Sequence, residues 1–250
     1  MGLAGVILAA GESSRMGRDK ALLPWPPATH PLSPSKEPDL RFSAKSVTAQ
    51  GAAERVRAPA PTREEDSGES LPDAAPCPSG TLLSSVIEAL GRCCDLVIVV
   101  AGKNERALRP VVYASGAFLV QNPSPERGQF SSLQTGLQQV LARGHDNAMV
   151  TLVDRPAPGP GTLALLVNSF TGRSHNCWAV VPEYDGKHGH PILIGREMIE
   201  KFLKASVAAS AREIEHANQQ HIAYVPVNDP TVTMNVDTPD EYASLQSLKP

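Results

Sequence analysis

The sequence predicts a three-layer α/β fold in which helices cover both faces of a mostly parallel β-sheet. Short, continuous apolar runs at residues 3–8, 95–100 and 148–153 are typical of strands that are buried on both faces. Between these runs, apolar residues recur with helical spacing, so strands and helices alternate along the chain. Such alternation favours parallel strands joined by helices that pack on the two faces of the sheet.

The predicted elements follow a regular order, and a capping box at residues 238–241 predicts the start of a last helix. Gly11, Gly102, Gly128 and Asp154 fall where predicted strands or their loops end. Because ligands bind at the carboxyl ends of the strands in such sheets, we expect the functional site at this edge. The other predicted helices span residues 82–90, 104–112 and 130–141, and the predicted strands span residues 3–8, 95–100, 117–120, 148–153 and 179–182.

Composition and charge exclude several classes of protein. The chain has 250 residues and a net charge of −3, which gives no basic footprint for nucleic acid or an anionic membrane. No apolar run approaches the roughly 20 residues that span a bilayer, and the apolar N-terminus lacks the basic region of a signal peptide. The four cysteines include no C-x-x-C pair, which suits a reducing compartment. We therefore expect a cytoplasmic protein that binds neither nucleic acid nor membranes.

Residues 26–79 differ in composition from the rest of the chain. They hold 10 of the 23 prolines, together with serine, glutamate and alanine, and few large apolar side chains. Such a segment cannot bury enough apolar surface to offset the entropy lost on ordering. We predict a single domain made of residues 1–25 and 80–250, interrupted by a flexible, proline-rich insertion at residues 26–79. The alternative is an arm that docks a partner protein.

The stretch from Leu8 to Trp25 has the features of a phosphate-binding loop. Small residues at 9–11 follow an apolar run and allow a ligand to approach the backbone closely. Loop N–H groups can then bind an anion, and Arg15 and Lys20 supply the positive charge that a polyphosphate needs. The alternative is an ordinary strand and turn with two solvated basic residues.

The order of residues in this stretch carries a more specific signal. Residues 8–24 read Leu-Ala-Ala-Gly-x-Ser-x-Arg-Met-Gly-x-x-Lys-x-Leu-Leu-Pro, which resembles the signature of the MobA/MocA-like nucleotidyltransferases at every fixed position. That family includes the molybdenum cofactor cytidylyltransferases and guanylyltransferases. The resemblance implies a Rossmann-like nucleotidyltransferase sheet and catalytic roles for Arg15, Lys20 and Asp154. It also implies nucleotide contacts from Leu8, Ala9, Ala10, Gly11, Ser13, Arg15 and Lys20.

Two carboxylates are candidates for a magnesium site. Asp154 directly follows a predicted strand, and Asp237 directly precedes the last predicted helix. Mg²⁺ uses few carboxylates and takes its other ligands from water and phosphate oxygens. The segments around both residues resemble the metal-binding motifs of the family, which implies that Asp154 and Asp237 bind Mg²⁺ with support from Asn235. The alternative for Asp154 is a turn-capping aspartate, and Arg155 is unusual at its position in the motif.

Two further segments resemble substrate-binding parts of the family. Gly128, Ser131 and Ser132 match a segment that lines the base and ribose, although serines at this place can also cap a helix. The tripeptide Gly189-His190-Pro191 resembles one that contributes to the acceptor side of cytidylyltransferase-type members. We therefore expect both segments to contact substrates.

Together these segments imply that a nucleoside monophosphate is transferred from an NTP to a phosphate-bearing acceptor, with release of pyrophosphate. No general base is required, because a phosphate monoester with a second pKa of about 6 is already a nucleophile near neutral pH. Guanylyltransferase members carry glycine where this chain has Ala10. This difference and the Gly-His-Pro tripeptide favour the cytidylyl branch of the family, which implies CTP as the donor and molybdopterin as the acceptor.

Other functions stay open at this point. The same chemistry could use GTP, or a sugar or alcohol phosphate as acceptor. A molybdenum hydroxylase or its chaperone is a possible partner, and a non-catalytic nucleotide-binding chaperone for molybdenum enzyme maturation is an alternative of another class. A protein-interaction module acting through residues 26–79 is a third.

Overall fold

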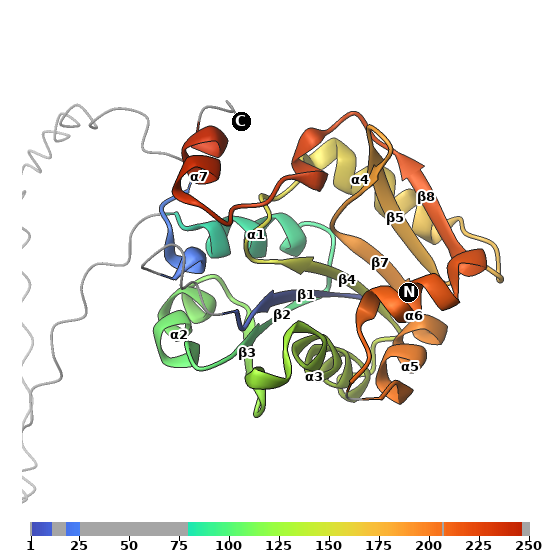
Figure 1. Cartoon of the computed structure of the whole chain (residues 1–250), viewed down its shortest axis with the longest axis horizontal. Coiled ribbons are helices and arrows are strands. Elements are labelled where there is room, and N and C mark those ends of the chain that lie inside the picture. The colour runs from blue at the N-terminus through green and yellow to red at the C-terminus, as the bar shows by residue number, and fades with distance from the viewer. Residues whose placement is uncertain (1, 12–18, 26–79, 207, 247–250) are drawn as a thin grey trace, which may run out of the picture. The chain divides into compact units, whose positions relative to one another are not determined.

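The structure, a computed structural model, describes residues 2–11, 19–25, 80–206 and 208–246 (Figure 1). These residues form an eight-stranded sheet in the order β3-β2-β1-β4-β7-β5-β6, and β8 pairs with β5. The strands are β1 (Leu3–Ala9), β2 (Leu96–Ala101), β3 (Phe118–Gln121), β4 (Asn147–Leu152), β5 (Ala179–Tyr184), β6 (Lys187–His188), β7 (Ile192–Gly195) and β8 (Ile222–Pro226).

The first half of the sheet is parallel and the second half is mixed. Strand β1 lies between β2 and β4 and is parallel to both, and β3 continues the parallel order beyond β2. Strand β7 is antiparallel to β4 and β5, and β5 pairs antiparallel with β6 but parallel with β8. The predicted mostly parallel α/β sheet is confirmed, with a reversal of direction at β7 that the sequence did not reveal.

Helices cover both faces of the sheet (Figure 1). One core packs β1 side chains such as Ile7 against α1, α2 and α4, and the other packs Val6 and Leu8 against α3 and α5. These two cores give the predicted three layers. The α-helices are α1 (Leu82–Gly91), α2 (Glu105–Ala114), α3 (Gln129–Ala142), α4 (Pro160–Thr171), α5 (Arg196–Lys204), α6 (Ala211–Ala217) and α7 (Pro239–Gln246). The short 3-10 helices are η2 (Lys20–Leu22), η3 (Pro125–Arg127), η4 (Gln219–His221) and η5 (Pro230–Thr233).

Every helix and strand predicted above overlaps an element of the structure. Helices α4, α5 and α6 and strands β6, β7 and β8 were not predicted. None of the helices in the described residues is long and apolar enough to cross a membrane.

A small core joins the two ends of the described chain. Leu23 and Leu82 pack against Val236 and Leu245, so that α7 lies beside η2 and the start of α1. The chain on either side of residues 26–79 is also joined, because Pro24 and Thr81 form a β-bridge and Trp25 N donates to Gly80 O at 3.1 Å. The predicted insertion itself lies outside the described residues.

Candidate active site

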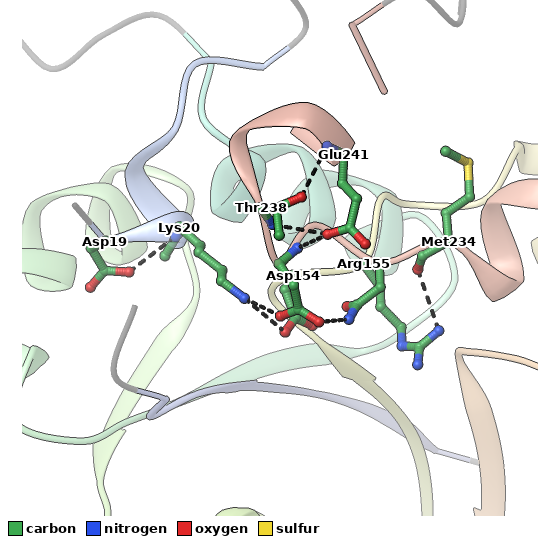
Figure 2. A network of polar contacts seen from close by, with 10 residues as sticks. Asp19, Lys20, Asp154, Arg155, Met234, Thr238 and Glu241 are labelled. Atoms are coloured by element: carbon green, nitrogen blue, oxygen red, sulfur yellow. Dashed lines mark hydrogen bonds and ion pairs between the residues drawn. The ribbon is translucent and has the colours of Figure 1, made fainter. Parts of the chain in front are cut away.

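Three charged side chains from distant parts of the sequence meet at the carboxyl edge of the sheet. Lys20 begins η2, Asp154 follows β4, and Asp237 precedes α7. Lys20 Nζ lies 3.7 Å from Asp154 Oδ2 and forms a second, closer ion pair with Asp237. Figure 2 shows the lysine side chain pointing toward Asp154. The structure thus brings together Lys20, Asp154 and Asp237, the described residues for which the sequence analysis predicted roles in catalysis or metal binding.

These three charged side chains are only partly exposed to water. The side chains of Lys20, Asp154 and Asp237 are 13%, 23% and 29% exposed, respectively. Burial raises the pKa of Asp154 above its ordinary value; Lys20 opposes this shift, whereas the negative charge of Asp237 adds to it. A cation that bound between the two carboxylates would favour their ionised forms.

The cap of α7 fixes the position of Asp237. Glu241 Oε2 accepts hydrogen bonds from Asp237 N at 2.7 Å and Thr238 N at 2.9 Å, and Thr238 Oγ1 accepts from Glu241 N at 3.3 Å (Figure 2). The predicted capping box is therefore confirmed. Val236 N donates to Asp154 O at 2.9 Å, which ties the segment before α7 directly to the end of β4.

Asp19 and Asn104 orient the loop that carries Lys20, and sequence reasoning missed both. Asp19 caps η2 by accepting from Ala21 N at 3.0 Å. Asn104 Nδ2 donates to Asp19 Oδ2 at 2.6 Å and to Ala9 O at 2.9 Å. Asn104 thus links the end of β1 to the start of η2. In the sequence, the one signal for Asn104 was its position two residues after Gly102, near the end of a predicted strand.

The donor set suits a divalent metal ion. Asp154 Oδ1 and Asn235 Oδ1 are buried and lack hydrogen-bond partners among the described residues, while the Asn235 amide donates to Asp237. Buried oxygens without partners are uncommon and are the ligands that hard cations prefer. In the described part of the chain, His, Cys, Asp and Glu side chains form no group of three suited to a metal. The site therefore offers few protein ligands, as expected where phosphate and water complete the shell.

Arg155 links the loop after β4 to the segment before α7. Its Nη1 donates to Met234 O at 3.3 Å (Figure 2), while its Nε is buried without a hydrogen-bond partner among the described residues. Burial lowers the pKa of the guanidinium, which Asp154 and Asp237 oppose. The unusual arginine of the motif thus holds the chain that carries Asp237.

Asp229 anchors the other end of this segment, which sequence reasoning also missed. Its carboxylate accepts from Gly159 N at 3.0 Å and Thr162 Oγ1 at 2.8 Å, at the start of α4, and from Thr231 N at 3.0 Å. The segment from β8 to α7 is therefore held at three points: by the contacts of Asp229, by the hydrogen bond from Arg155 to Met234 O, and by the α7 cap.

The predicted nucleotide-binding serines lie in a buried turn at the start of α3. Gly128 is the N-cap residue, with a φ of 86° that favours glycine, and no side chain caps the helix. Asn122 Nδ2 donates to Ser131 Oγ at 2.8 Å and to Ser132 Oγ at 2.9 Å. The serines hold the loop before α3 and do not cap the helix, so their contact with a base stays a prediction.

The remaining loop residues are only partly described. Leu8 and Ala9 are buried in β1, Ala10 is half-buried and Gly11 is exposed. Ser13 and Arg15 lie outside the described residues, and their predicted roles remain predictions.

The predicted acceptor tripeptide is held by backbone contacts. Gly189 N donates to Pro182 O and His190 N donates to Val232 O, both at 2.8 Å, and the His190–Pro191 peptide bond is cis. His190 Nδ1 lies 3.4 Å from Val150 O. Burial, with a smaller contribution from Arg155, lowers the pKa of His190 to about 4. The imidazole is therefore neutral near pH 7.

Acidification is expected to destabilise the protein through His190. Because its folded pKa of about 4 lies below the ordinary value of 6.5, stability is retained above pH 6.5 and lost as the pH falls to 4. The shift corresponds to about 3 kcal/mol of unfolding free energy. Urea unfolding at pH 7 and pH 4 should show that His190→Gln loses less stability on acidification than the wild type does. The control is His175→Gln at an exposed position; equal pH dependence of all three proteins would contradict the assignment.

Comparison with known proteins identifies the family. Residues 5–33 and 74–240 match the family model described as "MobA-like NTP transferase domain". The chain belongs to this family. As a MobA-like NTP transferase it is an enzyme of the nucleotidyltransferase class. The family membership that the loop signature predicted is confirmed.

The relatives of this MobA-like NTP transferase are distant in sequence. A "Probable molybdenum cofactor guanylyltransferase" of Mycobacterium avium is 27% identical over 214 residues, which cover 86% of this chain and 79% of the relative. The "Molybdenum cofactor cytidylyltransferase" of Escherichia coli is 21% identical over 238 residues, which cover 95% of this chain and 92% of the relative.

The fold is also shared with solved structures. Rv0371c of Mycobacterium tuberculosis, 21% identical, superposes with a TM-score of 0.66 over 99% of this chain and 98% of that one. A second structure of Rv0371c, a complex with manganese, is 19% identical and superposes with a TM-score of 0.62 over 99% of this chain and 100% of that one.

Proposed function

We propose that this enzyme transfers CMP from CTP to the phosphate of molybdopterin or of the molybdenum cofactor, and releases pyrophosphate. The observation that carries the proposal is the convergence of Lys20, Asp154 and Asp237 at the end of the sheet. The names of the relatives from Mycobacterium avium and Escherichia coli, which describe molybdenum cofactor nucleotidyltransferases, support the choice of acceptor.

The protein's own groups account for most of the chemistry. Backbone N–H groups of the loop after β1 and the cation of Lys20 bind and orient the phosphates. In the substrate complex Lys20 exchanges its carboxylate partners for the α-phosphate, where negative charge develops in the transition state. An oxygen of the acceptor phosphate forms a bond to the α-phosphorus, and the bond from that phosphorus to the oxygen bridging to the β-phosphate breaks.

We propose Mg²⁺ as the metal, held by Asp154 and Asp237 with support from Asn235. The buried, unpartnered oxygens of Asp154 and Asn235 are available to it. When bound, Mg²⁺ neutralises phosphate charge and helps to align the reacting groups. The manganese complex of Rv0371c supports a divalent ion in a protein of the same fold.

The preference for CTP depends on the start of the loop. The chain backbone is crowded there, because a Cβ placed on Gly102 would lie 2.8 Å from Ala10 O and 3.3 Å from Ala10 Cα. Ala10 adds a methyl group at a position where guanylyltransferases have glycine. We infer that this methyl group reduces the space for a purine base.

A pyrophosphate-release assay with the four NTPs, Mg²⁺ and molybdopterin tests the proposal. CTP is expected to give a kcat/KM at least about 10-fold above that of GTP, since one methyl group in a tight pocket is worth roughly 1–3 kcal/mol. The Ala10→Gly variant should narrow this ratio.

A higher kcat/KM for GTP would reject the cytidylyl assignment but retain the transferase. Nucleotide binding without pyrophosphate release, with molybdopterin or with sugar and alcohol phosphates as acceptors, would reject catalysis and support the chaperone alternative.

A further inference from the structure

A pocket of about 470 Å³ lies between the start of α3, the ends of β1 and β4, and α6. Its volume falls within the range of small-molecule sites. The floor is apolar and includes Leu8, Phe130, Leu152 and Ile192. Leu152, which lines the pocket near the carboxyl end of β4, lies two residues before Asp154 in the chain.

The carboxylate of Glu215 is the unusual feature of this pocket. Glu215 projects from α6 into the pocket lining, and burial raises the pKa of its carboxyl group. Among the described residues, its carboxylate makes no hydrogen bond or ion pair; Tyr224 is close enough that Glu215 contributes to raising the Tyr224 pKa. A partly buried carboxylate without protein donors can accept hydrogen bonds from a ligand that enters the pocket.

The shape and chemistry of the pocket restrict what can fill it. A flat ring fits an apolar floor of aromatic and aliphatic side chains, and two adjacent N–H donors on its edge would satisfy a carboxylate in a bidentate manner. The 2-amino-4-oxopyrimidine edge has such a pair: a ring N–H beside an amino group. Arg127 and Arg212 also line the pocket and suit a ligand that carries negative charge.

We propose that this pocket binds a 2-amino-4-oxopyrimidine ring, whose edge donates two hydrogen bonds to Glu215. The inference rests on the proposed function, whose acceptor carries that ring in its pterin; in the alternative that uses GTP, the guanine base carries it. Glu215 is then a specificity-determining residue of the proposed reaction.

Binding to the full-length protein, without NTP or turnover, tests the inference. Fluorescence titration with 6-hydroxymethylpterin is compared with 6-hydroxymethyllumazine, which has an oxygen in place of the amino group. Guanosine is compared with inosine, which lacks the amino group, by calorimetry. The amino-bearing member of at least one pair should bind about 10- to 100-fold more tightly than its analogue, the range for a hydrogen bond to a charged group.

The variant Glu215→Gln should abolish this preference, while Glu88→Gln, which removes an exposed carboxylate on α1, should preserve it. The ratio within a pair is the readout, because a general loss of folding would weaken both ligands equally. A preference for pterin over lumazine assigns the pocket to the acceptor, and a preference for guanosine over inosine assigns it to the donor base. No preference in either pair, or one that survives Glu215→Gln, overturns the inference. Since no pyrophosphate is measured, these results do not depend on the transferase assay.

Discussion

Replacing Lys20 with alanine, or Asp154 with asparagine, is expected to lower the rate of pyrophosphate release about 10²- to 10³-fold, as for the loss of one transition-state donor. Lys20 contributes positive charge where the α-phosphate reacts, and Asp154 lies 3.7 Å from its ammonium group. The measurement is the release of pyrophosphate from CTP at saturating Mg²⁺ and acceptor, where kcat reports the loss.

Two controls accompany these variants. Lys204→Ala removes an exposed lysine that pairs with Glu200 on α5, and Asp240→Asn changes an exposed carboxylate of α7 close to Asp237. Both should retain wild-type rates, because both residues are exposed. If Lys20→Ala and Asp154→Asn also released pyrophosphate at the wild-type rate, these residues would not belong to the catalytic site.

The second large effect is expected at Gly189, where alanine should cost about 3 kcal/mol of unfolding free energy. A Cβ on Gly189 would lie 2.3 Å from Val232 O and 2.7 Å from Val232 C, distances that real Cβ atoms do not show. Both contacts are with backbone, so a side-chain rotation cannot relieve them. The clash would also disturb the hydrogen bond from His190 N to Val232 O.

Urea unfolding of Gly189→Ala measures this cost, with Gly161→Ala as the matched control. A Cβ on Gly161, in the first turn of α4, would meet nothing within 4 Å. That control should be neutral or slightly stabilising, because alanine is the better helix former. A loss below about 1 kcal/mol at Gly189 would show that the backbone at Val232 moves aside easily.

The sequence predicted the layers, the parallel half of the sheet and the charged residues that meet at its edge. Continuous apolar runs identify buried strands. The signature loop points to Lys20, and the resemblance of the segment before α7 to the family's metal-binding motif points to Asp237. The residues around these groups were harder to find, because Asp19, Asn104 and Asp229 act through hydrogen bonds to segments distant in sequence.

The second half of the sheet was harder to predict for a different reason. Strand β7 has four residues and β6 has two, so alternation within them is too short to read. Helix α5 did carry a signal, since Met198, Ile199 and Phe202 recur at helical spacing and are buried. The reversal at β7 depends on pairing with β4, which local sequence does not encode.

Because of the β-bridge between Pro24 and Thr81, the length of the segment between these two residues need not affect the geometry of the candidate active site. Since the chain leaves at Trp25 and returns at Gly80 through a direct hydrogen bond, the connection between them can lengthen with only a small, logarithmic entropic penalty. These contacts hold the segment that follows Lys20 beside the α1 cap at Thr81. The fold therefore offers a place where sequence can be gained or lost while the chemistry beside it is left unaltered.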